Sequence, residues 1–398
     1  MARAAIAGCN RGMKNLTSRR RFLGASLAAP LLGTGLLRAQ DLAPVPEPPK
    51  PGAGKKLLVL GGTRFLGPAI VDHALSAGYE VTLYNRGRSN PHLYPELDKR
   101  IGDRNTADYS ALEDGEWDLV VDTSCYVPQH ARAAAEALKD KVGHYVLIST
   151  ISVYEALNGG TVEDGVVSED SPLATMDGEL AESFETIGAA FESGMQYYGP
   201  LKALCEQAVE EVMPGRTTSL RPGVIAGEQD PSDRFTYWVV RVAEGGEVLC
   251  PGSEGYDFQY TDVKDLGRWS VEFGTRGVGG AYNAIGFPGV VTMEEFLHGC
   301  KLATGQTEAT FTWASEEFLL ENDVTPFLEL PFWMPEAAAH RCANRRGIEA
   351  GMTFRPITET IEEVLAWHRR ERAADFAWGA YGMQAEREAE LLAKWHAR

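Results

Sequence analysis

The chain has 398 residues, 44% of them hydrophobic, which is enough for a large core in one elaborated domain or two subdomains. Its formal net charge is −18, and so acidic a surface repels phosphate backbones, which counts against nucleic-acid binding as the main role. The six cysteines are widely spaced without a C-x-x-C pair, so they predict buried thiols rather than a disulfide framework or a metal site.

The N-terminal stretch "SRRRFLGASLAA" (18–29) combines paired arginines with an apolar run from 22 to about 37. That run is shorter than the roughly 20 apolar residues that span a bilayer, so the pattern predicts a twin-arginine export signal over 1–39. The alternatives are an uncleaved membrane anchor and an incorrect start. The signal implies the Tat export machinery as a partner and a periplasmic or other extracytoplasmic location. Its removal would take away seven basic and no acidic residues, lowering the net charge from −18 to −25.

A Pro-rich linker is predicted over 40–54, followed by a strand, a glycine-rich turn, a helix and a second strand. Residues 57–60 are an apolar run typical of a buried parallel strand, a helix pattern covers 65–77, and "YEVTLYN" (79–85) is the next strand. A turn of this kind exposes backbone N–H groups that bind a pyrophosphate. The order of elements therefore predicts a dinucleotide site. Its candidate residues here are Gly61, Gly62, Thr63, Arg64, Phe65, Leu66 and Gly67.

The residues around the second strand bear on the choice of cofactor. Arg64 occupies the middle position of the three-glycine spacing, and its side chain can reach a phosphate. The second strand ends at Asn85, followed by Arg86 and Arg88, where a carboxylate would hold the ribose 2′-hydroxyl of NAD. These cations favour NADP over NAD. The alternative is that they are solvated loop residues.

Strands and helices continue to alternate along the first half of the chain. "GDR" (102–104) follows a short strand; Asp103 suits a contact to adenine and Arg104 is a further cofactor candidate. A strand over 117–124, a helix over 128–138 and a strand over 144–154 come next. This alternation predicts an α/β fold, a Rossmann doubly wound parallel sheet with its site at the C-terminal ends of the strands.

We expect the dinucleotide-binding domain to cover 55–221. A smaller C-terminal α/β substrate-binding subdomain follows at 222–368, interleaved with the last Rossmann elements, and a helical extension at 369–398. A helix is expected over 233–246, with its aromatic residues in the core. Thr292 and Glu295 have the spacing of a capping box.

Two stretches carry the residue types of a catalytic site. "ISTISVY" (148–154) ends a strand with the hydroxyls of Ser149, Thr150 and Ser152, and "YYGPLK" (197–202) begins a helix with Tyr198 and Lys202. Positions i and i+4 share one face of a helix, so the phenol and the ammonium point at the same place. A neighbouring ammonium lowers the pKa of a phenol, which makes a tyrosine usable as a general base and acid.

These stretches resemble, in order, the motifs of the extended short-chain dehydrogenases/reductases, the NAD-dependent epimerase/dehydratase family. The resemblance runs from about 55 to 367 and includes "GGTRFLG", "GDR", "ISTISVY", "YYGPLK", "LRPGVIAGEQDPSDRF" (220–235), "QYTDVKDLGRW" (259–269) and "FRPITETIEEVLAW" (354–367). Within the family the chain is similar to a branch that includes the chloroplast stem-loop-binding proteins, whose glycine turn is similarly altered.

The resemblance implies roles for individual residues. Tyr198 would be the acid and base, Lys202 its ribose-binding partner, and Thr150 the residue that hydrogen-bonds the reacting hydroxyl. Ser149 and Ser152 are the alternatives for that last role. Tyr197 is the nearest rival for the base, but the four-residue spacing selects Tyr198. The other candidates are Ser149 and Arg221 for the cofactor, and Ser152, Asp233, Arg234 and Asp262 for the substrate or the support of its site.

The segment between the strand-end hydroxyls and the tyrosine is longer than the family pattern. Tyr198 lies 48 residues after Thr150, and residues 155–196 hold ten carboxylates and no Lys or Arg. We call residues 155–196 the acidic insertion. It is either a solvated surface loop or a lid over the substrate, since long loops beside a site are often functional. An acidic lid would suit a neutral or cationic substrate.

The export signal and the fold together favour one class of reaction. No pool of nicotinamide or partner dehydrogenase regenerates a cofactor outside the cytoplasm, so a cofactor loaded before export must be regenerated in each turnover. We therefore expect an exported NAD(P)-dependent epimerase- or dehydratase-like enzyme that transiently oxidises a hydroxyl of a sugar or glycoside. The alternatives are a net NADP-dependent dehydrogenase or reductase, and a non-catalytic RNA-binding homologue. The resemblance also implies a possible homodimer.

Overall fold

The computed structural model describes residues 50–160, 165–287, 289, 291–335, 341–373 and 376–398. The predicted export signal (1–39) and residues 40–49 of the linker lie outside the described residues. Within the described part of the chain, no helix is long and apolar enough to cross a membrane. The five cysteines in this part are free and buried, which confirms the expectation of buried thiols.

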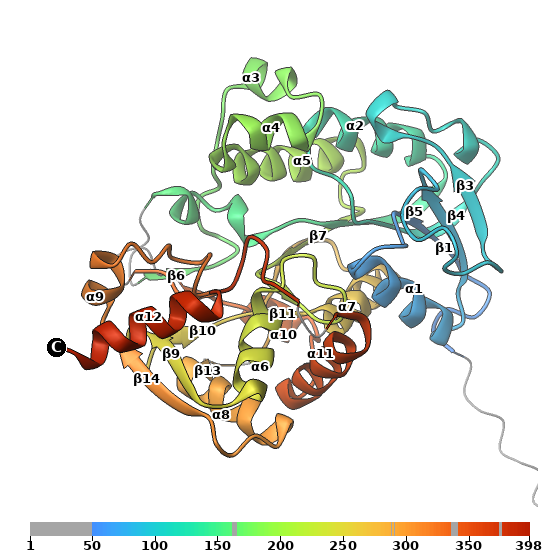
Figure 1. Cartoon of the computed structure of the whole chain (residues 1–398). Helices are drawn as coiled ribbons and strands as arrows, with labels where there is room; N and C mark the ends of the chain where they lie inside the picture. Colours follow the sequence, from blue (N-terminus) through green and yellow to red (C-terminus); the bar gives the residue numbers. More distant parts are fainter. Residues whose placement is uncertain (1–49, 161–164, 288, 290, 336–340, 374–375) are drawn as a thin grey trace, which may run out of the picture. The chain divides into compact units, whose positions relative to one another are not determined.

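A seven-stranded parallel sheet forms the centre of the first lobe, which we call the Rossmann lobe (Figure 1). The strand order is β12-β7-β5-β4-β1-β2-β3, and every neighbouring pair is parallel. The order changes direction between β1 and β4, the switch point at which ligands bind in such sheets. The predicted fold class is confirmed. The strands are β1 (Lys56–Leu60), β2 (Glu80–Asn85), β3 (Asp98–Ile101), β4 (Trp117–Asp122), β5 (Val142–Ile148), β7 (Thr217–Pro222) and β12 (Gly280–Ala284).

Helices cover both faces of this sheet. Leu57 and Val59 of β1 belong to the apolar cluster under α1 and α7, whereas Leu58 and Leu60 belong to the cluster under α2 and α5. Successive side chains of a strand point to opposite faces, so a wholly apolar strand must be covered on both sides. The four helices are α1 (Leu66–Ser76), α2 (Pro128–Leu138), α5 (Tyr198–Val212) and α7 (Val263–Arg276).

The C-terminal lobe has its own apolar core. Phe235, Tyr237 and Trp238 of α6 are fully buried in it, as expected for core aromatics. The capping box of Thr292 and Glu295 is confirmed at the start of α8. The elements are β8 (Ile225–Ala226), α6 (Arg234–Glu244), β9 (Glu247–Pro251), β10 (Asp257–Phe258), β11 (Thr261–Asp262), β13 (Val291–Thr292), α8 (Met293–Thr304), β14 (Thr310–Ala314), α9 (Glu316–Glu321), β15 (Arg341–Cys342), α10 (Arg345–Glu349), α11 (Ile357–Glu371) and α12 (Ala385–His396).

The last part of the chain belongs to this lobe. Leu391 and Leu392 of α12 lie in the same core, and Glu388 forms a buried ion pair with Arg241 of α6 at 2.6 Å. The predicted extension at 369–398 therefore packs on the C-terminal lobe over its described residues.

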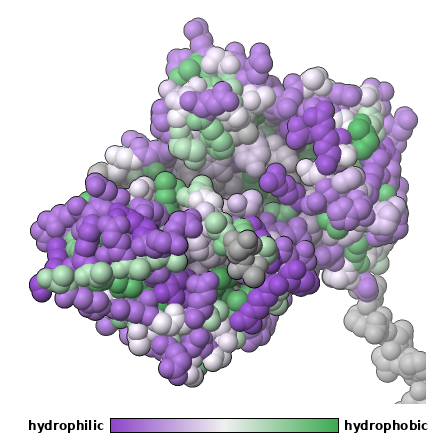
Figure 2. Space-filling model, in the orientation of Figure 1, coloured by the Kyte–Doolittle hydropathy of each residue, from purple (hydrophilic) through white to green (hydrophobic). Residues whose placement is uncertain are grey.

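Over its described residues, 155–160 and 165–196, the acidic insertion contains the strand β6 (Val166–Val167) and the short α-helices α3 (Gly178–Ser183) and α4 (Ile187–Ser193). β6 pairs in parallel with β15 of the C-terminal lobe, whereas α3 contacts α2 and α4 contacts α5 of the Rossmann lobe (Figure 1). The insertion thus touches both lobes. In Figure 2 the surface around α3 and α4 mixes hydrophilic and hydrophobic residues, and a hollow lies between these helices and the C-terminal lobe.

Candidate active site

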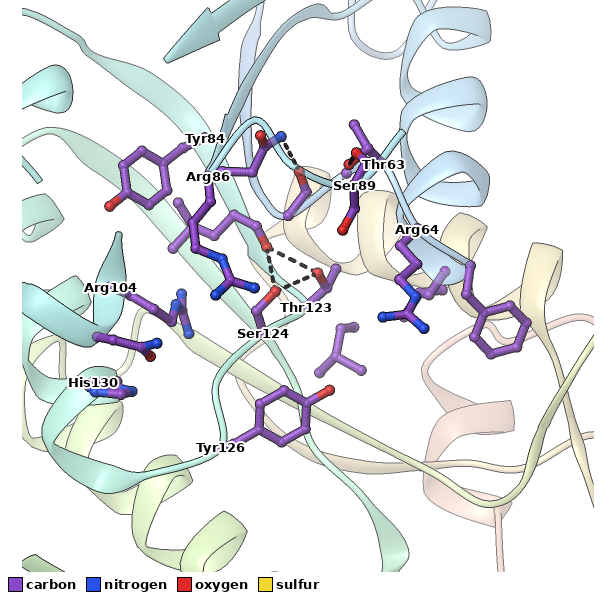
Figure 3. Close-up of a pocket in the computed structure, with 18 of the residues that line it drawn as sticks. Thr63, Arg64, Tyr84, Arg86, Ser89, Arg104, Thr123, Ser124, Tyr126 and His130 are labelled. Atoms are coloured by element: carbon purple, nitrogen blue, oxygen red, sulfur yellow. Dashed lines mark hydrogen bonds between the residues drawn. The ribbon is translucent and has the colours of Figure 1, made fainter. Parts of the chain in front are cut away.

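A cavity of about 620 Å³ lies at the C-terminal ends of β1, β2, β4 and β5, beside the switch point of the sheet. The glycine turn, the loops after β2 and β4, and the start of α5 line it. Figure 3 shows the side chains of Arg64, Arg86 and Tyr126 directed into one space. The sequence-predicted residues that line the cavity are Gly61, Gly62, Thr63, Arg64, Phe65, Leu66, Asn85, Arg86, Arg88, Asp103, Arg104, Ser149, Tyr198 and Lys202.

The glycine turn has room for a pyrophosphate because side chains are excluded from it. Gly61 and Gly62 have φ angles of 122° and 92°, which favour glycine. A Cβ on Gly67 would lie 2.5 Å from the carbonyl carbon of Gly62, so only glycine lets α1 pack against the turn. Bare backbone therefore borders the cavity at the N-terminus of a helix, where a phosphate binds favourably. These residues fit a dinucleotide.

The loop after β2 is tied to the glycine turn by three side-chain hydrogen bonds. Asn85 Nδ2 donates to the Gly61 carbonyl at 3.0 Å, Thr63 Oγ1 donates to the Ser89 carbonyl at 2.8 Å, and Asn90 Nδ2 donates to the Thr63 carbonyl at 2.8 Å. The two loops are thus held together before any ligand binds.

Three arginines on these two loops border the cavity. Arg64, Arg86 and Arg88 are exposed, and none of their guanidinium groups has a hydrogen bond or an ion pair with another described residue. Asn85 places a neutral amide, not a carboxylate, at the end of β2. The arrangement offers three unpaired cations to an anionic group.

A buried ion pair supports the other side of the cavity. Arg104 Nη2 donates to both carboxylate oxygens of Asp122, at 2.9 and 3.0 Å, and the Tyr145 hydroxyl donates to the same carboxylate at 2.7 Å. Burial raises the pKa of Tyr145, and the charge of Asp122 raises it further, so the phenol stays a donor. Arg104 Nη1 is buried without an acceptor among the described residues. Asp103, beside it, accepts from the Asn105 backbone and lines the cavity.

Tyr198 begins α5, and Lys202 follows four residues later on the same wall of the cavity. Lys202 is 2% exposed, and its Nζ donates to the carbonyls of Cys125 at 2.5 Å and Ile148 at 2.7 Å. Burial lowers the pKa of Lys202, but its interactions with Tyr198 and other neighbouring groups outweigh burial, so the pKa is raised overall. The ammonium stays charged beside the phenol.

The strand-end hydroxyls occupy different places. Ser149 is buried and lines the cavity, and its hydroxyl has no hydrogen-bond partner in the described part of the chain. The Thr150 hydroxyl accepts from the Ser152 backbone N–H at 3.1 Å and donates to the Ser152 hydroxyl at 3.2 Å. Neither residue is part of the cavity lining. The structure thus brings Ser149 to the cavity with Tyr198 and Lys202.

Two predicted residues of the second half lie in buried ion pairs away from the cavity lining. Arg221 pairs with Glu206 at 2.6 Å and donates to the Tyr154 hydroxyl at 2.9 Å. Asp262 caps α7 and accepts from Arg355 at 3.0 Å. Both side chains have protein partners for their charges.

Asp233 and Arg234 are also partnered by protein groups outside the cavity lining. Asp233 accepts from Arg372 at 3.1 Å, while burial raises the pKa of Asp233 against the lowering effect of that arginine. The Arg234 guanidinium lies 5.3 Å from the ring centroid of Phe327 and 5.1 Å from that of Tyr381. The C-terminal segment therefore supplies the partners of two substrate candidates.

The acidic insertion reaches the cavity. Thr186 is part of the lining, and the Phe191 ring lies 5.7 Å from that of Tyr198, centroid to centroid. Gln129 Nε2 of α2 donates to the Phe184 carbonyl at 2.5 Å. The insertion thus borders the tyrosine that we expect to react, and its action as a lid stays a prediction.

The sequence interpretation missed several lining residues on the loop after β4 and at the start of α2. Thr123, Ser124, Tyr126 and His130 line the cavity, and Asp122 anchors Arg104 from the end of the strand. The signal was present, since this loop follows a central apolar strand whose C-terminal end must face the site. Among the described residues, no group of three His, Cys, Asp or Glu side chains is arranged to hold a metal ion.

The sequence is also similar to a known protein family and to a characterised relative. The family model described as "NAD dependent epimerase/dehydratase family" matches residues 57–284. The "Chloroplast stem-loop binding protein of 41 kDa b, chloroplastic" of Arabidopsis thaliana is 30% identical over 229 residues. That match covers 53% of each protein, so the chain spans about half the length of the curated relative it matches.

Similar solved structures include the Bordetella bronchiseptica enzyme WbmH in complex with NAD+, at 19% identity and a TM-score of 0.57, with 80% of this chain and 100% of that chain covered. The UDP-glucuronic acid 4-epimerase of Bacillus cereus in complex with NAD is 16% identical with a TM-score of 0.56, with 81% and 100% covered. At these identities the likeness concerns the fold.

Proposed function

The chain belongs to the NAD-dependent epimerase/dehydratase family, and from this premise we propose that it transiently oxidises a hydroxyl of a sugar, a glycoside or a related polyol. One observation carries the proposal: a single cavity holds the glycine turn together with Ser149, Tyr198 and Lys202. A dinucleotide bound on the turn would share that cavity with a base, a cation and a hydroxyl.

In this mechanism Tyr198 is the residue that accepts and returns the proton. Its phenolate removes the proton of the substrate hydroxyl, and the phenol returns it when the transient ketone is reduced. Lys202 places its ammonium on the same cavity wall as Tyr198. When bound, the nicotinamide would supply the hydride acceptor and donor. The Phe191 ring, 5.7 Å from the Tyr198 ring, brings the acidic insertion next to the reacting phenol.

A hydroxyl beside Tyr198 would bind the reacting oxygen, and two residues are candidates. Thr150 is the residue that the family motif selects, whereas Ser149 is the one whose unpartnered hydroxyl lines the cavity. Ser149→Ala and Thr150→Ala separate them: the residue in contact with substrate loses about 10- to 100-fold in turnover on losing its hydroxyl. The other variant keeps its rate.

The proposed cofactor is NADP, with NAD as the alternative. Arg64, Arg86 and Arg88 are unpaired cations on the rim next to the end of β2, and Asn85 offers no carboxylate to repel a 2′-phosphate. Arginine binds phosphate through charge-assisted hydrogen bonds, so these residues favour the phosphorylated cofactor.

We further propose that the protein is exported through the twin-arginine route with its cofactor bound. Export would separate it from any enzyme that regenerates nicotinamide, which favours an epimerisation, a dehydration or an exchange between two substrates. Nucleotide sugars are cytoplasmic, so a free sugar or a glycoside is the proposed substrate. The acidic insertion beside Tyr198 favours a neutral substrate over an anionic one.

The test is the content and turnover of protein purified from its native location. We expect released NADP(H) by mass spectrometry, and we expect Tyr198→Phe to keep the cofactor while losing about 100- to 10,000-fold in turnover. Protein that holds no nicotinamide and has no affinity for it would overturn the proposal.

The main alternative is a net dehydrogenase or reductase in the cytoplasm. Steady consumption of added NADPH, with no return of hydride to the product, would select that function. An RNA-binding role, suggested by the name of the Arabidopsis relative, would require RNA retention on a filter at low salt by protein that binds no nicotinamide.

A further inference from the structure

Tyr126 lies against the ammonium of Lys202, in the loop that follows β4. Lys202 Nζ is 5.2 Å from the centroid of the Tyr126 ring and donates to the carbonyl of the preceding residue, Cys125. Tyr126, Tyr198 and Lys202 line the same cavity. One short loop thus supplies both a carbonyl and an aromatic face to the ammonium.

The Lys202 ammonium is buried without a carboxylate partner among the described residues, which is unusual for a charged side chain. The side chain is 2% exposed, and no carboxylate of the described residues forms an ion pair with it. A buried ammonium without an anion is costly unless other groups stabilise its charge. The carbonyls of Cys125 and Ile148 accept two of its three N–H groups, and the negative face of an aromatic ring stabilises a cation further.

Tyr126 is suited to this contact. Burial raises the pKa of its phenol, the neighbouring Tyr198 raises it further, and Lys202 lowers it, so the group stays neutral. Tyr126 is 36% exposed and lines the cavity. Its hydroxyl has no hydrogen-bond partner in the described part of the chain, so the contact with Lys202 is made through the ring face.

We propose that Tyr126 is a positioning residue, whose ring face and the carbonyls of Cys125 and Ile148 hold the Lys202 ammonium at the cavity wall. The third N–H of Lys202 has no acceptor among the described residues and is available to a ligand. The inference rests on the proposed function for that ligand, a nicotinamide dinucleotide. It gives a positioning role to the loop after β4, which is not part of any of the family motifs identified in the sequence.

A double-mutant cycle on the full chain tests the proposal, with NADPH as the probe and its nicotinamide fluorescence as the signal. The variants are Tyr126→Phe, which keeps the ring, Tyr126→Leu, which removes it, and each of these combined with Lys202→Met. We expect Tyr126→Phe to bind NADPH like the native protein and Tyr126→Leu to bind about 2- to 30-fold more weakly, the range of a cation–π contact.

The Lys202→Met background separates positioning from a general structural effect. If the ring acts through the ammonium, Tyr126→Leu changes the affinity less than about twofold once Lys202 is gone. An equal loss in both backgrounds overturns the proposal. So does a Phe variant as weak as the Leu variant, because the hydroxyl and not the ring face would then matter.

A second measurement does not depend on the cofactor. The same variants are unfolded in urea without ligand, and we expect the Leu variant to be less stable than the Phe variant only where Lys202 is present. A protein that binds no NADPH but shows this coupling contradicts the proposed function and supports the role of Tyr126. A protein that binds NADPH but shows no coupling between Tyr126 and Lys202 supports the proposed function and contradicts the role of Tyr126.

Discussion

The glycine turn and the acidic insertion border the same cavity, but they are held in place differently. Behind the turn, Gly67 packs against backbone, and the nearby Asp122 is fully buried with Arg104. In the insertion, Phe191 is 40% exposed and Asp170 forms its ion pair with 83% of its side chain in solvent. The turn is therefore held by buried contacts, whereas the contacts of the insertion are largely exposed to solvent, and we expect the insertion to yield first when a ligand enters.

The comparison predicts the largest difference in the free energy of unfolding for substitutions of two aspartates, Asp122 and Asp170. Asp122→Asn leaves Arg104 buried without its anion and is expected to cost about 3–5 kcal/mol in the free energy of unfolding. Asp170→Asn removes the exposed pair with Arg346 and is expected to cost about 0–1 kcal/mol. Urea unfolding of both variants measures the difference. Equal costs would mean that the two sides of the cavity are equally rigid.

Two glycines give the next test. A Cβ on Gly67 meets the backbone of Gly62, so Gly67→Ala is expected to cost about 1–3 kcal/mol of stability and to abolish NADPH binding. A Cβ on Gly178, the first residue of α3, has nothing within 4 Å, and Gly178→Ala is expected to be neutral or slightly stabilising. Thermal unfolding and NADPH titration check both. Native affinity in Gly67→Ala would contradict a rigid turn.

The arginines test whether the preformed side also selects the cofactor. We expect Arg86→Ala combined with Arg88→Ala to weaken NADPH binding about 10- to 100-fold and NADH binding less than about threefold. Arg132→Ala is the control, because Arg132 is half exposed on α2 and pairs with Glu211 outside the cavity lining. Fluorescence titration with both cofactors gives the ratio. Equal losses for NADPH and NADH would remove the argument for NADP.

The smallest effect is expected in the insertion. Phe191→Ala removes the ring against Tyr198, and NADPH should then dissociate about 2- to 10-fold faster with little loss of stability. Leu180→Ala is the matched control, since Leu180 is 39% exposed on α3 of the same insertion and, like Phe191, is not part of the cavity lining, but it has no ring against Tyr198. Displacement of NADPH by excess NADP+ measures the rates. Identical rates in the two variants would show that the insertion does not retain the cofactor.

Much of the fold and part of the candidate site could be predicted because the relevant patterns are local. The apolar strand from Leu57 to Leu60, the glycines and the helix that begins at Leu66 are neighbours in sequence, so their order alone predicts a turn that fits phosphates. Tyr198 and Lys202 share a helix face through their spacing, and the structure places both on one cavity wall.

The partners of charged residues could not be predicted in this way. Arg221 was expected to contact the cofactor, yet its guanidinium forms a buried ion pair with Glu206, fifteen residues away in sequence. Asp262 likewise forms its ion pair with Arg355, 93 residues further along the chain. Burial strengthens such pairs by removing water, and the chain segments that become buried together are known only from the packing.

The sequence by itself determined the sheet, the glycine turn and the Tyr198–Lys202 pair, because periodicity and spacing act over a few residues. Only the tertiary structure decided that Ser149, and not Thr150, lines the cavity, and that Tyr126 lies against Lys202. It also decided that the acidic insertion reaches Tyr198 through Phe191. The physical reason is that these contacts join separate segments of the chain, whose meeting depends on how the two lobes bury their apolar surfaces.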